Sequence, residues 1–271
     1  MEGRGTLKTS VQGFEVLDHP GAWGLARPEA TPWVRYVLEG GDTLHPAAGA
    51  DRDALVVEGR RPVYVIPAKV RNADGSQGPG LRWAVRRFAR GGRVLPTLLG
   101  DRFLRWGIPR PVHEARVSEE ARRRGVPTPR VVAAMVYPRG PFYRADLVTE
   151  FIPEATDLVE DLFDTRRKGP GGAAERLDAL RAAGALVLSM ARAGLRHEDL
   201  HAGNILLQWE GAAPRGFILD LDRARALPLG NRASPGPMLR RLKRSLRKWE
   251  GRTGLRISQR EWATLDEAAM G

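Results

Sequence analysis

The chain has 271 residues, of which 42% are hydrophobic and 28% charged, as in a globular protein large enough to bury a substantial core. It has no cysteine, which excludes disulfides and thiolate metal sites. No apolar run approaches the ~18 residues of a membrane span, and residues 1–12 lack the apolar stretch of a signal peptide. We therefore expect a cytoplasmic protein. The formal net charge of +12 favours an anionic partner such as a nucleotide, a phosphorylated lipid or a nucleic acid, although arginine-rich codon usage explains it equally well.

Residues 1–55 are rich in glycine, proline and alanine, and their weak periodicity predicts an irregular extension with one edge strand. Residues 56–152 are expected to form a strand-rich first lobe with one helix. Its predicted elements are strands at 63–70 and 81–88 joined by turn-forming residues 72–80, a helix at 111–124, and strands at 131–137 and 146–152.

Residues 153–271 are predicted to form a helix-rich second lobe. The predicted elements are a short helix at 157–163, a loop at 169–172, a long helix at 173–193, strands at 205–208 and 217–219, and a tail helix at 238–249. Strands gathered in one lobe and helices in the other predict the α+β class.

The segment that follows the long helix carries the residues most suited to catalysis. His197 and Asp199 come first, Asn204 follows five residues after Asp199, and Asp220 ends the next strand. Phosphoryl transfer needs a carboxylate to orient the acceptor hydroxyl and take its proton, which suits Asp199; a magnesium ion on the phosphates needs hard oxygen ligands, which Asn204 and Asp220 supply. Each residue taken alone is most simply a turn residue. The ordered set matches the protein-kinase catalytic loop H-x-D-x-x-x-x-N and predicts a protein-kinase-like bilobal fold.

The first lobe should supply a cation for the ATP phosphates and a glutamate that holds it. We expect Arg86 in this role with Glu114 as its partner, because the two are 28 residues apart and Arg86 lies in a predicted third strand. Lys69 is the competing cation, and a surface role for Arg86 stays open. No G-x-G-x-x-G motif occurs; residues 59–64 are a weak substitute. The adenine is expected to meet backbone groups near Glu150 and Ile152.

Three further features carry alternatives. His197 is expected to brace the loop rather than transfer protons, and Asp222 either helps to bind a second metal or is a plain loop carboxylate. The helix at 238–249 alternates apolar and basic residues, which suits either an interfacial helix on anionic lipid or a packed helix with a solvated basic face.

The sequence resembles the lipopolysaccharide kinase family, and within it the 3-deoxy-D-manno-octulosonic acid (Kdo) kinases, from about Gly59 to the C-terminal region. The matching segments are residues 85–92, 122–129, 143–150, the catalytic loop, 218–223 and 239–248. The resemblance implies an ATP- and Mg²⁺-dependent kinase that phosphorylates the Kdo sugar of lipid A, peripheral on the cytoplasmic face of the inner membrane, and no nucleic-acid partner. It also supports Arg86, because family members carry arginine at the third-strand position. His201 and Gly203 depart from the family loop, which bears on the identity of the sugar.

Two other functions stay open on the sequence. One is a kinase for another acceptor, such as an aminoglycoside-like small molecule or a protein. The other is a non-catalytic module that binds anions or nucleic acid on a kinase fold. The complete set of Asp199, Asn204 and Asp220 argues against the second.

Overall fold

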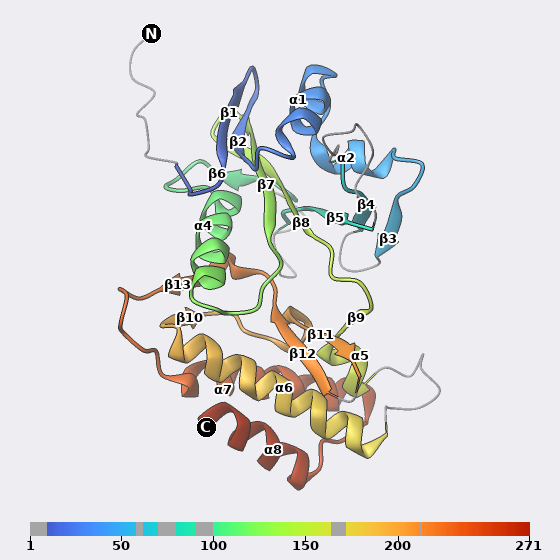
Figure 1. The fold of residues 1–271 in the computed structure, drawn as a ribbon, viewed down its shortest axis with the longest axis vertical. Helices are drawn as coiled ribbons and strands as arrows, with labels where there is room; N and C mark the ends of the chain where they lie inside the picture. The colour runs from blue at the N-terminus through green and yellow to red at the C-terminus, as the bar shows by residue number, and fades with distance from the viewer. Residues whose placement is uncertain (1–9, 58–61, 70–79, 90–99, 164–171, 212) are drawn as a thin grey trace. The chain divides into compact units, whose positions relative to one another are not determined.

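The computed structural model describes residues 10–57, 62–69, 80–89, 100–163, 172–211 and 213–271. Their contacts divide the chain into two compact units, which Figure 1 shows in ribbon form. Unit 1 takes Met1–Arg116 and Arg130–Phe151, and unit 2 takes Val117–Pro129 and Ile152–Gly271. The division at residue 151 lies next to the boundary expected at 152, but the segment 117–129 groups with the later unit.

Unit 1 is built on an antiparallel sheet with the strand order β1-β2-β7-β8-β5-β4-β3, and β6 also pairs with β8. The strands are β1 (Glu15–His19), β2 (Ala22–Ala26), β3 (Leu55–Val57), β4 (Val63–Pro67), β5 (Arg82–Arg87), β6 (Phe103–Leu104), β7 (Val131–Arg139) and β8 (Phe142–Glu150). Counted from the β3 edge, β5 is the third strand, as the sequence analysis expects for the strand that carries Arg86.

The central strand β7 is buried on both faces, which explains why its sequence is a continuous apolar run rather than an alternating one. Ala133 and Met135 pack into one core cluster, whereas Ala134 and Val136 pack into another on the opposite face. The first cluster is covered by α1 (Thr31–Glu39) and α2 (Leu44–Gly49), and the second receives Val112 and Ala115 from α4 (Arg110–Arg123).

The expectation of irregular structure in residues 1–55 is wrong for most of that segment. β1 does form one edge of the sheet, but β2, α1 and α2 are regular elements. The helices were missed because α1 is only nine residues long and α2 only six, so each carries too few turns for a clear 3.6-residue period. Val34, Val37 and Leu38 nevertheless bury one side of α1.

Unit 2 has a single core around the long helix α6 (Ala173–Arg192). The other helices are α5 (Leu158–Phe163), α7 (Pro235–Thr253) and α8 (Gln259–Met270). Two small sheets accompany them, β12-β11-β9 and β10-β13. Their strands are β9 (Ala155–Asp157), β10 (Leu195–His197), β11 (Ile205–Glu210), β12 (Ala213–Ile218) and β13 (Ala224–Ala226).

Close packing of α6 on α8 depends on a glycine. A Cβ at Gly184 would lie 2.7 Å from the carbonyl oxygen of Leu265 and 2.8 Å from the Cβ of Ala268. The two helices could not approach this closely with a larger residue at this position. Among the described residues, no helix combines the length and the apolar character needed to cross a bilayer.

The predicted elements of the central and C-terminal segments are confirmed within a few residues at their ends, and so is the α+β class. The turn at 72–80, the glycine loop candidate at 59–64 and the loop at 169–172 lie wholly or partly outside the described residues. In α7, Met238, Leu239, Leu242 and Leu246 are buried in the unit 2 core. The helix is therefore a packed helix with an exposed basic side, and its apolar side is not available to a lipid surface.

Candidate active site

His197, the last residue of β10, connects the two parts of the predicted catalytic segment. Its Nδ1 accepts a hydrogen bond of 3.1 Å from the backbone N–H of Asp199, and its Nε2 lies 3.1 Å from the carbonyl oxygen of Asp220. Because a backbone N–H can only donate, Nδ1 must be unprotonated and Nε2 carries the hydrogen that the Asp220 carbonyl accepts. The ring is buried, and this burial lowers its pKa although the neighbouring Asp220 and Asp199 act in the opposite direction. The neutral ring thus holds the two backbone segments together.

Asn204 is buried in the short helical turn Ala202–Asn204 that leads into β11. Its N–H donates to the carbonyl of His201 at 2.9 Å, and its own carbonyl accepts from the N–H of Leu219 at 2.8 Å. Ile205 of β11 pairs with Ile218 of β12. The residue before β11 and the residues after β12 therefore lie at the same end of the hairpin, which brings Asn204 next to the segment that holds Asp220.

Asp220 adopts a left-handed backbone conformation, with φ of 57° and ψ of 61°. A non-glycine residue in this region costs on the order of 1–3 kcal/mol, and aspartate is one of the residue types that tolerates it best. The conformation turns the chain from β12 into the helical turn Leu221–Arg223, and the bond from His197 to the Asp220 carbonyl fixes it. A sharp turn at this point explains why the strand predicted through Leu219 ends at Ile218.

The Asp199 side chain is open to solvent, with 62% of its surface exposed. Arg223 Nη1 lies 4.0 Å from Asp199 Oδ2, and the Arg223 carbonyl accepts from the N–H of Glu198 at 3.3 Å. Arg223 is not among the residues expected at the site from the sequence, because its position beside Asp199 depends on the pairing of β10 with β13. An exposed carboxylate on a fixed loop is accessible to an acceptor hydroxyl.

In unit 1, Arg86 and Glu114 form an ion pair between β5 and α4. Arg86 Nη2 donates to Glu114 Oε1 at 2.6 Å and to Oε2 at 2.5 Å, and its guanidinium lies over the ring of Phe88 at 4.6 Å. The glutamate is buried and the arginine is half-buried. Lys69, the competing cation, pairs instead with Asp51 at 2.6 Å. Glu114 is therefore the partner of Arg86 and not of Lys69.

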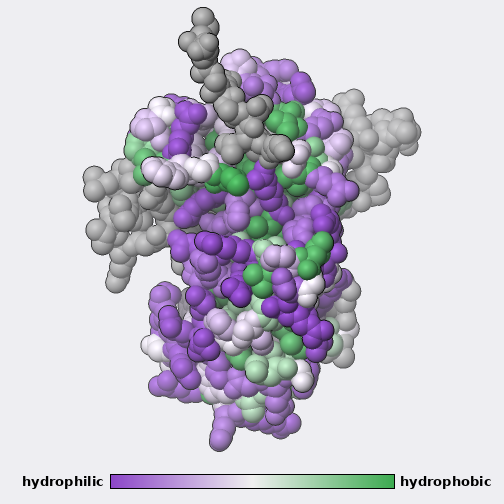
Figure 2. Space-filling model, turned by 90° about the vertical axis from the view of Figure 1, so that its left-hand side faces the viewer, coloured by the Kyte–Doolittle hydropathy of each residue, from purple (hydrophilic) through white to green (hydrophobic). Residues whose placement is uncertain are grey.

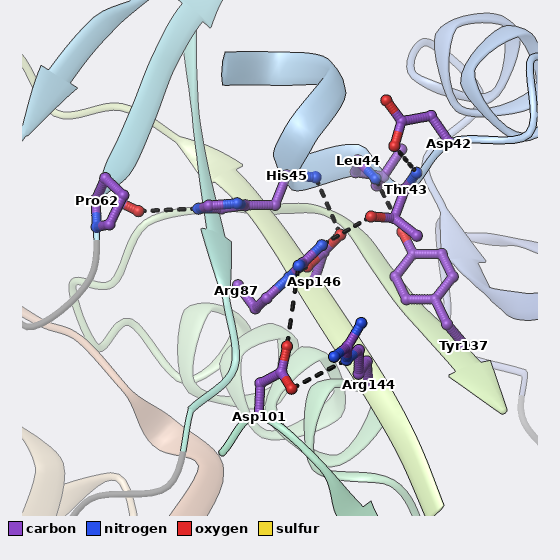
Figure 3. A network of polar contacts seen from close by, with 10 residues as sticks. All are labelled: Asp42, Thr43, Leu44, His45, Pro62, Arg87, Asp101, Tyr137, Arg144 and Asp146. Carbon is purple, nitrogen blue, oxygen red and sulfur yellow. Dashed lines mark hydrogen bonds and ion pairs between the residues drawn. The ribbon is translucent and has the colours of Figure 1, made fainter. Parts of the chain in front are cut away.

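Arg87, the next residue on β5, points to the opposite face of the sheet and belongs to a buried network (Figure 3). Its Nε donates to Asp146 Oδ1 at 3.1 Å, and its Nη2 donates to Thr43 Oγ1 at 2.7 Å. Burial lowers the pKa of Arg87, but the charge of Asp146, the hydrogen bond to Asp146 and the charge of Asp101 together raise it by more, so the pKa is raised overall. Asp146 has no exposed surface. β5 is thus fixed to β8 at the position directly after Arg86.

The same network attaches the N-terminal segment to the sheet. The N–H of Leu44 donates to the hydroxyl of Tyr137 at 3.1 Å, and the N–H of His45 donates to Asp146 Oδ2 at 3.0 Å (Figure 3). Burial and the charge of Asp146 raise the pKa of Tyr137 well above its usual value, so the hydroxyl keeps its proton. Residues of the expected irregular extension therefore contribute to the polar core of unit 1.

The segment predicted to meet the adenine ends unit 1. The N–H of Glu150 donates to the carbonyl of Arg130 at 2.9 Å, and the N–H of Phe151 donates to the carbonyl of Arg82 at 2.8 Å. The Glu150 carboxylate also binds the Arg130 guanidinium at 3.1 Å. The backbone N–H groups of Glu150 and Phe151 are therefore both used in hydrogen bonds to neighbouring segments of unit 1.

Magnesium fits the oxygen donors that unit 2 gathers. An amide oxygen from Asn204 and a carboxylate from Asp220 are hard ligands of the kind that Mg²⁺ combines with substrate phosphates. The described residues contain no group of three or more His, Cys, Asp or Glu side chains that could hold a metal by themselves.

Comparison with known proteins decides the family. The model of the lipopolysaccharide kinase (Kdo/WaaP) family matches residues 69–268. The chain belongs to this family. As a family member it is a kinase, a phosphotransferase that uses ATP and acts on an alcohol group. The matched region begins in unit 1 and includes Arg86, Glu114 and the whole catalytic segment, whereas β1, β2, α1 and α2 lie before it.

The similar curated proteins share one activity by name. The chain is 31% identical to the 3-deoxy-D-manno-octulosonic acid kinase of Vibrio parahaemolyticus over 68% of its own length and 73% of the relative. It is 32% identical to the enzyme of that name from Xanthomonas axonopodis pv. citri, with 68% and 69% covered. A solved structure described as WaaP in complex with acyl carrier protein has a TM-score of 0.49 and 18% identity, over 88% of this chain and 86% of that one.

Proposed function

We propose that this kinase transfers the γ-phosphoryl group of ATP to a hydroxyl of the Kdo sugar in the inner core of lipopolysaccharide. The observation that carries the proposal is the His197 bridge, which joins the backbone of Asp199, whose carboxylate is exposed, to the turn that holds Asp220. Relatives named for the same sugar, at about 30% identity, supply the acceptor class.

Asp199 acts on the acceptor in this mechanism. Its carboxylate accepts a hydrogen bond from the acceptor hydroxyl, orients the oxygen toward the γ-phosphorus and takes the proton as the new oxygen–phosphorus bond forms. The bond between the γ-phosphorus and the β,γ-bridging oxygen breaks, and ADP leaves with the electron pair. His197 keeps a neutral ring throughout, because both of its nitrogens are engaged with backbone groups and its pKa is lowered. It positions Asp199 and does not transfer protons.

Asn204 and Asp220 are the residues that would hold Mg²⁺, which neutralises charge on the triphosphate when it is bound. Asn204 is held by backbone bonds on both sides, and Asp220 is held by His197. Asp222, in the helical turn after Asp220, is half-buried, and a second metal contact from this residue stays a proposal.

Arg86 is proposed as the cation that binds the ATP phosphates, with Glu114 fixing its guanidinium. The arginine is only partly exposed, so few of its rotamers remain when Glu114 holds Nη2. Arg87, the residue after Arg86, anchors β5 through its hydrogen bond to Asp146 on the other face of the sheet. Nucleotide specificity is assigned to backbone groups of Glu150 and Ile152.

The enzyme is also proposed to work at the cytoplasmic face of the inner membrane, since its acceptor is a lipid-linked sugar. The exposed side of α7 supports an electrostatic contact with anionic lipid headgroups. Its exposed cations are Arg240, Arg244, Arg247, Lys248 and Arg252.

The acceptor is tested by incubating the purified chain with labelled ATP, Mg²⁺ and Kdo-bearing lipid A. The controls are lipid A without Kdo and the de-acylated Kdo acceptor. Label in the Kdo-bearing lipid and not in the sugar-free lipid is the expected result. Label only in the protein itself would exclude a sugar acceptor.

A further inference from the structure

The end of β6 and the loop from β6 to α4 expose three large apolar side chains at alternate positions. Leu104 is 57% exposed, Trp106 is 92% exposed and Ile108 is 43% exposed. Single exposed apolar residues are common on protein surfaces, but three of this size within five residues form a patch that marks an interaction site. Neither the proposed catalytic residues nor the proposed nucleotide contacts use this loop.

Arginines surround this apolar loop, and acidic side chains are absent from it. Arg102 precedes β6 and Arg105 follows it, and both are exposed, as is Arg139 at the end of β7. The sequence has no aspartate or glutamate from residue 102 to 113, or from 131 to 145. Asp101, just before the loop, is buried and bound to Arg144 at 2.9 Å, so it does not face outward. The exposed surface is therefore apolar and cationic together.

The loop is held in place by its own backbone and by the neighbouring turn. Leu104 pairs with Phe142, and the N–H of Arg105 donates to the carbonyl of Pro141 at 2.9 Å. The N–H of Trp106 donates to the Leu104 carbonyl at 2.9 Å. At the start of α4, the N–H of Arg110 donates to the Tyr143 hydroxyl at 3.1 Å. A loop fixed in this way presents its apolar side chains at little cost in conformational entropy.

We propose that this surface, which we call the Trp106 loop (residues 102–108 with Arg139), docks the protein on an anionic lipid bilayer. Trp106 and Ile108 enter the boundary between headgroups and acyl chains, where an indole ring is well accommodated, and the arginines bind lipid phosphates. Figure 2 views the side on which Figure 1 draws β6, and hydrophobic residues lie there among hydrophilic ones. The occupant is a bilayer because tryptophan, aliphatic side chains and exposed arginines together complement its apolar and anionic layers.

This assignment differs from the interfacial helix at 238–249, which was one of the two alternatives that the sequence left open. In α7 the apolar side chains are buried in the unit 2 core, so that helix offers cations alone, which act only while salt screening is weak. The Trp106 loop offers exposed apolar side chains together with cations. It lies in unit 1, and α7 can add electrostatic attraction of its own.

The test measures binding of the full chain to vesicles without Kdo, lipid A or ATP, so its outcome does not depend on the proposed acceptor. Co-sedimentation with phosphatidylethanolamine–phosphatidylglycerol vesicles is compared with co-sedimentation with phosphatidylcholine vesicles. The double variant Trp106→Ser/Ile108→Ser should bind anionic vesicles at least about tenfold more weakly than the wild type, because two inserted apolar groups are lost. Tyr36→Ser is the matched control, because Tyr36 is 76% exposed in the same unit but lies outside the loop. This variant should bind anionic vesicles as strongly as the wild type does.

Circular dichroism melting should be the same for both variants, since the substituted side chains are exposed. Arg102→Gln/Arg105→Gln should weaken binding to anionic vesicles and reduce its salt dependence, with the apolar residues intact. Unchanged binding of the Trp106→Ser/Ile108→Ser variant would overturn the proposal. A failure of the wild-type protein to bind anionic vesicles would overturn the proposal as well, and would favour a protein partner for the loop.

Discussion

Arg86 donates two hydrogen bonds from one guanidinium nitrogen to both carboxylate oxygens of Glu114, 28 residues further along the chain. The pair joins the third strand of the sheet to the helix that follows it. Because Glu114 is buried and Arg86 is only partly so, the pair fixes the direction of the arginine while leaving part of it accessible.

Glu114→Gln should raise the KM for ATP and lower kcat, because an amide holds the guanidinium more weakly than a carboxylate does. We expect a loss of about 10- to 100-fold in kcat/KM, the range that misplacement of a phosphate-binding cation produces. Steady-state kinetics with varied ATP measures it. Lys69→Ala is the matched control: Lys69 pairs with Asp51 in the same unit and should leave the KM for ATP unchanged. If the Lys69 variant lost nucleotide binding and the Glu114 variant did not, the two cations would have to exchange roles.

Asp220→Asn should keep the fold and lose the reaction. Asparagine tolerates the left-handed backbone at this position, so the free energy of unfolding should stay within about 1 kcal/mol of the wild type. The charged metal ligand is lost, and kcat should fall by about 10³-fold or more. Glu154→Asn is the control, because Glu154 also has a positive φ, of 53°, but is exposed and far along the chain from the catalytic segment. Normal activity of Asp220→Asn would remove Asp220 from the proposed metal site.

His197 should make stability depend on pH below neutrality. Burial lowers its pKa in the folded state below the ordinary value of 6.5, so an unfolded chain binds a proton that the folded chain does not. The stabilisation is complete above pH 6.5 and is lost progressively as the pH falls from 6.5 toward the folded-state pKa. Urea unfolding of the wild type and His197→Gln at several pH values measures this. The variant should lose less stability than the wild type over this interval; equal slopes would show that His197 does not titrate differently in the two states.

Gly184→Ala should destabilise unit 2 by about 1–3 kcal/mol, because the added methyl group collides with the backbone of α8. Gly251→Ala in α7 is the matched substitution. A Cβ at Gly251 meets no atom within 4 Å, so the same change should be neutral or stabilising by up to about 1 kcal/mol. Thermal unfolding distinguishes the two. A stable Gly184 variant would indicate that α6 and α8 can separate without loss.

The sequence was most informative where one period or motif dominates. Residues 173–193 place Leu180, Leu186 and Val187 at helical spacing, and the helix they predict differs from α6 by one residue at its end. The spacing of Asp199 and Asn204 identifies the catalytic segment. Residues 31–49 gave no such signal, because their helices are short and are held partly by contacts to distant residues such as Tyr137 and Asp146.

Long-range pairing explains the other omissions at the site. Nothing local indicates that Arg223 lies beside Asp199, because the two residues are brought together by the pairing of β10 with β13, which are distant in the sequence. Whether Arg86 or Lys69 pairs with the glutamate of α4 likewise depends on contacts between residues that are distant in the sequence. Their partners, Glu114 and Asp51, lie 28 and 18 residues away on opposite sides along the chain.

The central claim is that Asp199 performs the proton transfer, and its most direct test is single-turnover phosphate transfer to Kdo-bearing lipid A by Asp199→Asn. Glu198→Gln serves as the neighbouring control, because Glu198 is also exposed and is paired with Arg225 at 3.5 Å. We predict that Asp199→Asn binds ATP with wild-type affinity and transfers phosphate at least about 10³-fold more slowly, whereas Glu198→Gln reacts normally. Transfer by Asp199→Asn at the wild-type rate, with nucleotide binding intact, would contradict the account.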